Sequence, residues 1–143
     1  MNGKSRGEYL FLYGSLLTGT GDRGFDARLH RVLRPYSAAY AQARLYDLGE
    51  YPAAVVSADA RDKVYGTVFR LRRPEFLTPL DRYELYHPDD PRHSEYLRCL
   101  TRVTLLPSRR PFGCWAYFYN GTITKRPRIR RGDYAVYLGA RGV

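Results

Sequence analysis

Glu84 is the residue whose position in the sequence first suggests chemistry. The segment from Thr78 to Pro88 predicts a short helix, with Thr78 as its N-cap residue and Pro88 at its end. Leu80 and Tyr83 mark the apolar face of this helix, and at about 100° per residue Glu84 projects within about 40° of Leu80. A carboxyl buried on such a face has a raised pKa. It is therefore suited to proton transfer near neutral pH.

Two non-catalytic interpretations of Glu84 stay open at this stage. Its carboxylate could form an ion pair with an arginine such as Arg98 or Arg82. Alternatively, the helix could end early enough to leave Glu84 in solvent. The same spacing places Asp81 and Arg82 further from the apolar face, so both side chains are expected to be solvated.

The second candidate is a glycine turn after the first apolar run of the chain. Residues Tyr9–Tyr13 have strand character, and they are followed at once by Gly14 and Ser15. A buried strand that runs into such a turn brings backbone N–H groups to the end of a sheet, where they can hold an anion. The glycines that follow match neither a dinucleotide-binding fingerprint nor a P-loop. The sequence thus predicts an anion cradle, and Ser15 is not expected to act as a nucleophile.

The composition bounds the class of protein that could carry these residues. The chain has 143 residues, 44% of them hydrophobic and 27% charged, which predicts one globular domain over residues 1–143. Its net charge is +10, so nucleic-acid binding has to be considered. The basic residues are spread along the chain, however, in short clusters such as the segment 125–131. A solvated arginine-rich surface is therefore preferred, and the role of 125–131 is left open.

Signals for metal binding, membrane insertion and export are weak in this sequence. Cys99 and Cys114 lie in apolar segments without a metal-binding partner at suitable spacing, so free thiols are expected. A disulfide would be possible if those strands pair, but the expected compartment disfavours it. The three histidines form no metal-binding motif, and neither a metal nor another cofactor is predicted. No apolar run approaches the roughly 20 residues that a membrane span needs, and the N-terminus lacks the order of a signal peptide. A cytoplasmic location without membrane contact is the resulting expectation.

The elements that must position Glu84 and the glycine turn are mostly strands. Strands are expected at 9–13, in the latter half of 36–46, and at 53–56, 64–71, 97–106 and 112–119. A helix is expected after Asp22, with apolar residues at i, i+4, i+7 and i+8 from Phe25, and Pro35 is expected to end it. Gly66, inside one of the strands, suggests a bulge. Short turns between these elements predict an α+β fold.

Six short motifs, in their order along the chain, resemble one known family. They are 13–16 (Tyr-Gly-Ser-Leu), 45–53 (Leu-Tyr-Asp-Leu-Gly-Glu-Tyr-Pro-Ala), 64–68 (Val-Tyr-Gly-Thr-Val), 80–84 (Leu-Asp-Arg-Tyr-Glu), 96–98 (Tyr-Leu-Arg) and 115–117 (Trp-Ala-Tyr). The succession resembles the gamma-glutamylcyclotransferase-like superfamily, and it is closest to the small bacterial and gamma-glutamylamine cyclotransferase branch. The resemblance extends from about Tyr9 to Tyr137, which is nearly the whole chain.

The resemblance carries expectations for the fold and for the site. It implies a small mixed β-barrel of about six strands, with one or two flanking helices and a cavity at one end. It implies that Glu84 is the catalytic acid and base. The residues that it places at the glutamyl end of the substrate are Tyr13, Gly14, Ser15, Leu16 and Tyr117.

The sequence also departs from the pattern of the family at the rim of the implied site. Leu85 stands after Glu84, where the family often has glycine, and an insert from His87 to Glu95 separates Glu84 from Tyr96. These departures bear on the substrate and on the shape of the rim more than on the reaction. Tyr96 and Arg98 match family positions for which a structural role is an open alternative.

The implied reaction releases 5-oxoproline and a free amine from a small-molecule gamma-glutamyl amide or peptide. It needs no metal, nucleotide or covalent nucleophile, because the substrate's own α-amine attacks its γ-carbonyl carbon. Two alternatives are kept. One is a non-catalytic or differently specialised relative that binds a small molecule in the same cavity, and the other is a basic nucleic-acid-binding barrel. The leaving amine and the oligomeric state stay open.

Overall fold

The computed structural model of the chain describes residues 9–142, without the side chains of Ser15, Thr18 and Arg141. Its elements, in chain order, are β1 (Tyr9–Leu12), α1 (Ser15–Thr18), α2 (Arg23–Val32), β2 (Leu33–Ala41), β3 (Ala43–Asp47), β4 (Pro52–Val56), β5 (Val64–Leu71), η2 (Pro74–Phe76), α3 (Leu77–Tyr83), η3 (Pro91–His93), β6 (Tyr96–Leu106), β7 (Pro111–Tyr119) and α4 (Tyr134–Gly142).

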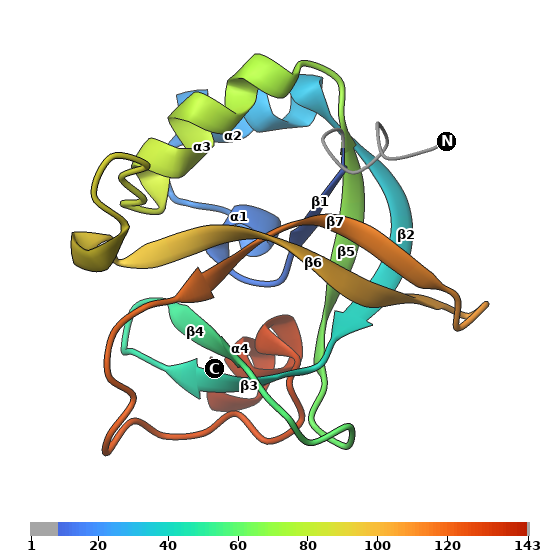
Figure 1. The fold of residues 1–143 in the computed structure, drawn as a ribbon, viewed down its shortest axis with the longest axis vertical. Helices are drawn as coiled ribbons and strands as arrows, with labels where there is room; N and C mark the ends of the chain where they lie inside the picture. The colour runs from blue at the N-terminus through green and yellow to red at the C-terminus, as the bar shows by residue number, and fades with distance from the viewer. Residues whose placement is uncertain (1–8, 143) are drawn as a thin grey trace.

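Five of the strands close into a barrel in the order β1-β5-β2-β6-β7 (Figure 1). The neighbours are antiparallel except β1 and β7, whose parallel pairing closes the barrel. Strands β3 and β4 form a separate two-stranded sheet. The predicted α+β class and the small mixed barrel are therefore confirmed.

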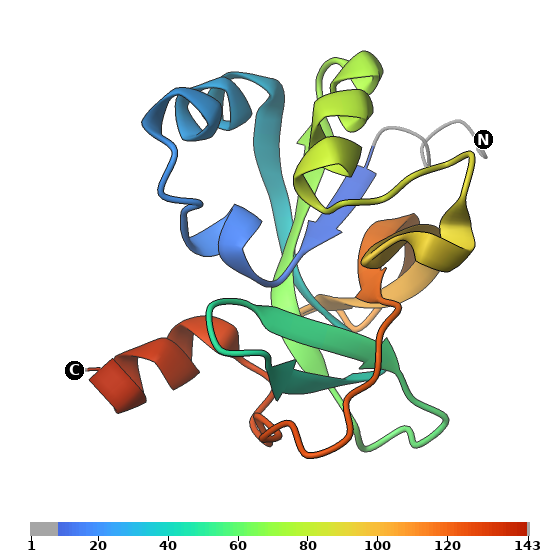
Figure 2. The same ribbon diagram turned by 90° about the vertical axis from the view of Figure 1, so that its left-hand side faces the viewer.

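Helices α2 and α3 lie at the opposite end of the molecule from α4. In both views α2 and α3 lie side by side at one end, whereas α4 and the β3–β4 sheet lie at the other (Figures 1 and 2). The predicted helix after Asp22 is α2, and Asp22 caps it, because its carboxylate accepts a hydrogen bond from the Phe25 N–H. Helices α2 and α3 together cover the barrel at this end.

Strand β1 connects the two hydrophobic cores of the molecule. Successive side chains of a strand point to opposite faces. Phe11 accordingly packs with the barrel interior, while Leu10 and Leu12 pack in a second cluster with residues of α2 and α3 such as Leu29 and Leu80. The predicted strand is thus buried on both faces, and it ends one residue earlier than expected, at Leu12.

Of two predictions about the chain after the first helix, the one for Pro35 is wrong and the one for the strand in the latter half of 36–46 is incomplete. Pro35 does not end the helix, which already stops at Val32, and Pro35 lies inside β2. The segment 36–46 holds parts of two strands, because the chain leaves the barrel at Gln42 and enters the second sheet. The Gln42 side chain donates a hydrogen bond to the Ser57 carbonyl at 2.8 Å, across the mouth of this second hairpin.

Gly66 is required for close packing and not for the predicted bulge. The register shift between β2 and β5 lies in β2, between Pro35 and Ser37. A Cβ atom on Gly66 would overlap the backbone carbonyl of Leu12 in β1. Backbone cannot move aside as a flexible side chain can, so only glycine fits between β1 and β2 at this position.

Part of the basic segment 125–131 belongs to the packed structure. The Asp47 N–H donates to the Pro127 carbonyl, and the Ile129 N–H donates to the Leu45 carbonyl, so the segment runs along the edge of β3. Ile129 is buried in the barrel core. The Arg128 guanidinium binds the Asp62 carboxylate at 2.7 Å. This segment therefore packs along β3 and contributes Ile129 to the barrel core.

Replacing Gly66 by alanine is expected to lower the free energy of unfolding by about 1–3 kcal/mol, because the added methyl group overpacks the β1–β5 contact. Urea denaturation measures the change. Gly139→Ala is the matched control, since its Cβ would meet no atom within 4 Å and it lies in α4. That variant should gain about 0.5–1 kcal/mol. Equal stability of the two variants would contradict the close-packing argument.

Candidate active site

A cavity of about 190 Å³ opens where the ends of β1 and α3 meet the beginnings of β4 and β6. Its lining residues come from five separate stretches of the chain: Phe11, Leu12, Tyr13, Gly14, Leu16, Tyr51, Pro52, Tyr83, Glu84, Leu85, Glu95, Tyr96 and Tyr117. Typical sites for drug-sized ligands have about 300–1,000 Å³. The cavity therefore suits a group of amino-acid size, and a larger ligand would extend through its mouth.

The cavity brings together most of the residues that the sequence singled out. Tyr13, Gly14, Leu16, Glu84 and Tyr117 all line it. Ser15 begins α1 between Gly14 and Leu16, but its side chain lies outside the described part of the structure. The glycine turn and the helix bearing Glu84 thus face one shared space.

Glu84 is a partly buried carboxyl in the cavity wall. Among the described side chains and backbone groups, none forms a hydrogen bond or an ion pair with its carboxylate. Burial raises the pKa of Glu84 to about 8, and the nearby negative charge of Glu95 adds to this shift. Glu84 therefore changes its protonation state close to neutral pH.

The end of α3 determines where Glu84 points. The helix ends at Tyr83, well before Pro88, and Glu84 is its C-cap residue. The Leu85 N–H donates to the Arg82 carbonyl at 3.1 Å and the Tyr86 N–H donates to the Asp81 carbonyl at 2.9 Å, which is the Schellman pattern.

Leu85 follows the helix in a left-handed conformation, with φ of 54°. This position after a helix usually holds glycine, because a side chain is disfavoured there. Glycine, which the resembled family often has at this position, would suit the same backbone conformation. The leucine side chain is 49% exposed and lines the cavity, so it adds apolar surface at the mouth.

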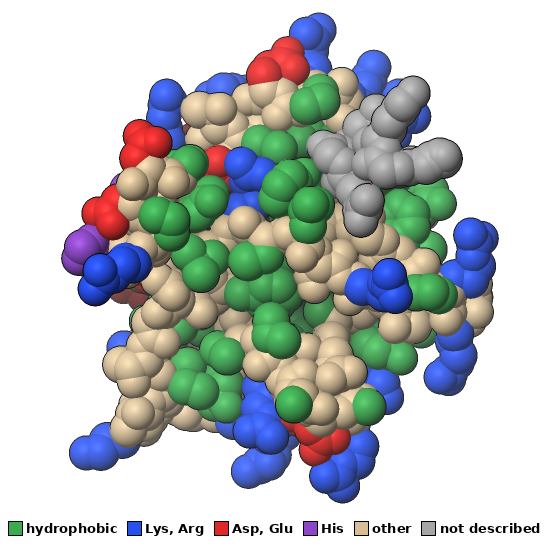
Figure 3. Space-filling view, viewed as in Figure 1, with side chains coloured by type: hydrophobic (Ala, Val, Ile, Leu, Met, Phe, Trp, Pro, Cys, Tyr) green, Lys and Arg blue, Asp and Glu red, His purple; other side chains and the backbone are tan. Residues whose placement is uncertain are grey.

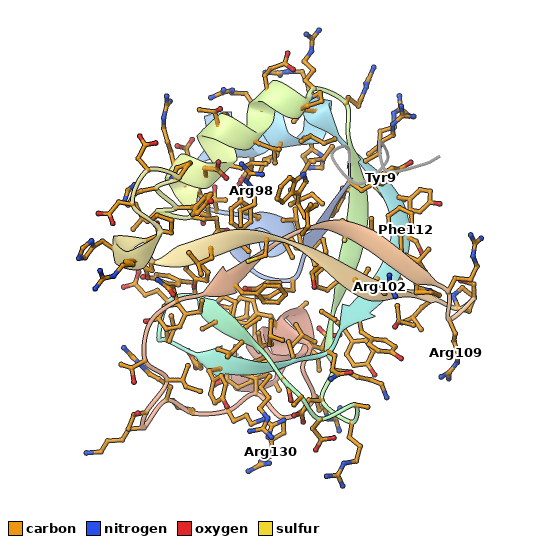
Figure 4. All side chains as sticks on the ribbon, in the orientation of Figure 1. Tyr9, Arg98, Arg102, Arg109, Phe112 and Arg130 are labelled. Carbon is orange, nitrogen blue, oxygen red and sulfur yellow. The ribbon has the colours of Figure 1, made fainter. Side chains whose placement is uncertain are left out.

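Asp81 is buried and paired, so the prediction that it is solvated is wrong. Its side chain accepts hydrogen bonds from Arg98 at 2.7 and 3.1 Å and from the Tyr117 hydroxyl at 2.7 Å. The Arg98 guanidinium also lies over the Trp115 ring, 4.3 Å from its centroid. Arg98 points into the space between α3 and the barrel, while Arg109 and Arg130 project outward (Figure 4). The ion pair suggested between Arg98 and Glu84 does not form.

The α3 helix also begins differently from the prediction. Phe76, and not Thr78, is the N-cap residue, and the 3₁₀ turn η2 leads directly into the helix. Phe76 is buried and stacks on Phe25 of α2, with ring centroids 6.1 Å apart. The start of α3 is therefore anchored by apolar packing and its middle by the Asp81 pair.

Three cavity tyrosines direct their hydroxyl groups into the protein. Tyr13 donates to the Tyr117 carbonyl and Tyr96 donates to the Pro52 carbonyl, both at 2.7 Å. Tyr117 donates to Asp81. Burial raises the pKa of each of these hydroxyls above the usual value, so all three remain neutral. Among these groups, Glu84 is the one able to exchange a proton near neutral pH.

The described residues contain no group of three His, Cys, Asp or Glu side chains that could hold a metal ion. Within the same residues, no helix is long and apolar enough to cross a membrane. Cys99 and Cys114 are free cysteines, as expected.

A comparison with known protein families shows to which family the chain belongs. A family described as gamma-glutamyl cyclotransferase, AIG2-like, matches residues 10–136. The chain belongs to this family. The match covers β1 to the start of α4, and it therefore includes every residue that lines the cavity. Among curated proteins, no significant sequence match was found.

Solved structures support the same fold for this AIG2-like chain. An AIG2-like protein from Mus musculus has a TM-score of 0.64 at 17% identity, over 89% of this chain and 87% of that one. YtfP from Escherichia coli has a TM-score of 0.61 at 26% identity, over 88% and 95%. YkqA from Bacillus subtilis has a TM-score of 0.67 at 18% identity over 94% of this chain, which spans only 42% of YkqA. Family and fold together indicate a cyclotransferase-like protein.

Asp81→Asn is expected to lower the free energy of unfolding by about 3 kcal/mol, because it leaves the charge of Arg98 largely buried without its partner. Asp90→Asn serves as the control. Asp90 is exposed and its carboxylate pairs with the exposed His93, so a change of about 0–1 kcal/mol is expected. Thermal and urea unfolding measure both variants. A similar small loss in each would show that the Asp81 pair does not anchor α3.

Glu84→Gln is expected to stabilise the protein, increasingly so at higher pH. Between pH 4.5 and about 8 the unfolded state has lost the Glu84 proton and the folded state keeps it. The stability of the parent protein therefore falls as pH rises through this window, and glutamine removes the loss. A gain of about 1–3 kcal/mol is expected at pH 8.5, with a much smaller one at pH 5. Urea denaturation at both pH values tests this, and a gain independent of pH would contradict it.

Proposed function

We propose that this AIG2-like protein is a gamma-glutamyl cyclotransferase that converts a gamma-glutamyl amide into 5-oxoproline and a free amine. The observation that carries the proposal is the carboxyl of Glu84, which lines the cavity without a protein partner in the described structure and has a pKa of about 8. Such a carboxyl is destabilising for the fold, so a role in proton transfer explains its presence.

The bond changes of this reaction are few. The α-amine nitrogen of the substrate attacks its own γ-carbonyl carbon, and a five-membered ring forms. The amide C–N bond then breaks, and the departing nitrogen leaves as an amine after gaining a proton. Because the nucleophile is part of the substrate, the protein's main task is to hold the substrate in a folded conformation.

Glu84 would carry out both proton transfers. In its ionised form it accepts a proton from the α-amine as the new C–N bond forms. It then gives this proton to the departing nitrogen, which returns Glu84 to its ionised form. A group whose pKa lies near the working pH performs both steps well, since neither protonation state is strongly disfavoured.

The glycine turn would hold the negatively charged parts of the substrate. The N–H groups in the first turn of a helix have no partner within that helix. In α1 these include the N–H groups of Ser15 and Leu16. They would bind the α-carboxylate of the glutamyl group or the oxyanion that develops on the γ-carbonyl. Gly14 and the Tyr13 and Tyr117 rings would form the wall against the glutamyl methylenes.

Glu84→Gln is expected to reduce 5-oxoproline formation by about 10²–10⁴-fold, because glutamine cannot accept the α-amine proton. Chromatographic measurement of 5-oxoproline from a panel of gamma-glutamyl amides and dipeptides tests this. Glu75→Gln is the matched control, since Glu75 is 73% exposed on η2 and does not line the cavity. Circular dichroism shows whether the variants fold.

The pH dependence belongs to the same experiment. The parent kcat/KM should rise with pH and reach half of its maximal value near pH 8, where Glu84 ionises. A Glu84→Gln variant with parental turnover would refute the proposal. Binding of these amides without any 5-oxoproline would instead identify a non-catalytic relative that binds small molecules.

A further inference from the structure

The cavity is acidic although the protein is basic. The chain has a net charge of +10, yet the cavity-lining residues include two carboxylates, Glu84 and Glu95, and no lysine, arginine or histidine. A ligand that fills this cavity therefore meets two carboxyl groups and no positive side chain. The proposed reaction uses Glu84, whereas Glu95 has no part in its proton transfers.

Glu95 is held firmly at the mouth of the cavity. Its N–H donates to the Leu85 carbonyl at 2.9 Å, and its carbonyl accepts from the Asn120 N–H at 2.8 Å. The Tyr51 hydroxyl donates to its Oε2 atom at 2.8 Å. Among the described groups, none forms a hydrogen bond with its Oε1 atom. The carboxylate is thus oriented by the protein and keeps one oxygen for a ligand.

Apolar side chains surround Glu95 at the mouth. Within the described residues, seven large hydrophobic side chains are exposed, and three of them, Tyr51, Tyr83 and Leu85, line this one cavity. Exposed apolar groups gathered at a cavity indicate a binding surface. Leu85 also occupies a left-handed position that favours glycine, and strain of this kind is retained where the side chain has a use.

The size of the cavity determines which part of a substrate reaches this mouth. With the glutamyl group between the glycine turn and Glu84, the volume of about 190 Å³ leaves little space for the departing amine. The amine must then extend outward, past Leu85 and Tyr51 to Glu95. Its first atoms would contact apolar rings, and its far end would meet a carboxylate.

We propose that Glu95 selects gamma-glutamyl amides whose departing amine carries a second, positively charged group at the end of a short apolar stem. The same carboxylate disfavours departing amines that end in a carboxylate, because two negative charges would share the mouth. This inference rests on the proposed function, since it assigns the recognition of the departing amine to the mouth of the same cavity. Glu95 is accordingly a residue that determines specificity and takes no part in the chemistry.

The experiment compares three gamma-glutamyl amides of matched length, made with diaminobutane, butylamine and aminobutyrate. Their free ends are positive, neutral and negative. At low salt the parent kcat/KM is expected to be about 10–100-fold higher for the diaminobutane amide than for the aminobutyrate amide, with the butylamine amide between them. Added salt should reduce this ratio, because screening weakens the interaction with Glu95.

Glu95→Gln preserves an acceptor for the Tyr51 hydroxyl and removes only the charge, so the ratio should fall to about 3-fold or less. Glu75→Gln changes the net charge equally and should keep the parental ratio, because Glu75 lies outside the cavity. A parental ratio in Glu95→Gln, or equal turnover of the three amides by the parent protein, would overturn the inference.

Failure of the proposed function is distinguishable from failure of this inference. If no amide yields 5-oxoproline, the proposed function fails, and calorimetric dissociation constants of the corresponding glutaryl amides test Glu95 alone. These compounds lack the α-amine and cannot cyclise. Tighter binding of the glutaryl diaminobutane amide, lost in Glu95→Gln, would still support the selection. Equal dissociation constants for all three would refute it.

Discussion

The position of the candidate acid depends on one buried interaction, the contact of Asp81 with Arg98 and Tyr117. The α3 helix has seven residues, and a helix this short is not stable by itself. Leu80 and Phe76 bury its apolar side, but apolar packing alone allows a helix to slide or rotate. The directional hydrogen bonds of Asp81 to β6 and β7 remove this freedom. Glu84, three residues later, is thereby aimed at the cavity.

The position of the glycine turn depends on close backbone packing. Strand β1 is buried on both faces, and the chain must turn sharply after Tyr13 to form α1. At Gly14 an added Cβ would lie 2.8 Å from the Pro52 ring, so the turn sits directly against the start of β4. Gly66 permits the equally close contact beside Leu12. The glycines therefore bring the turn near Glu84, which side chains of any size would prevent.

Local patterns in the sequence predicted the local parts of this structure. The strand at 97–106 and the candidate Glu84 followed from two- and four-residue spacings, which do not depend on the rest of the fold. The buried state of Asp81 could not be predicted this way, since its partners lie 17 and 36 residues further along the chain. Glu95 was missed for the same reason. The α4 helix did leave a signal, because Tyr134, Tyr137 and Leu138 have helical spacing and pack against the barrel core.

The contrast between the basic surface and the acidic cavity has a physical consequence for substrate orientation. Lysine and arginine side chains occur at several separate places around the face in Figure 3 and not in a single patch. Their combined field attracts a ligand that carries a carboxylate, whatever its orientation. Within the cavity the carboxylate of Glu95 would repel that group, and the N–H groups of the glycine turn would bind it. If the proposed function holds, long-range attraction and short-range repulsion together would favour entry with the α-carboxylate at the turn and the amines toward the two glutamates. This is the orientation in which the α-amine lies beside the carboxyl that would accept its proton.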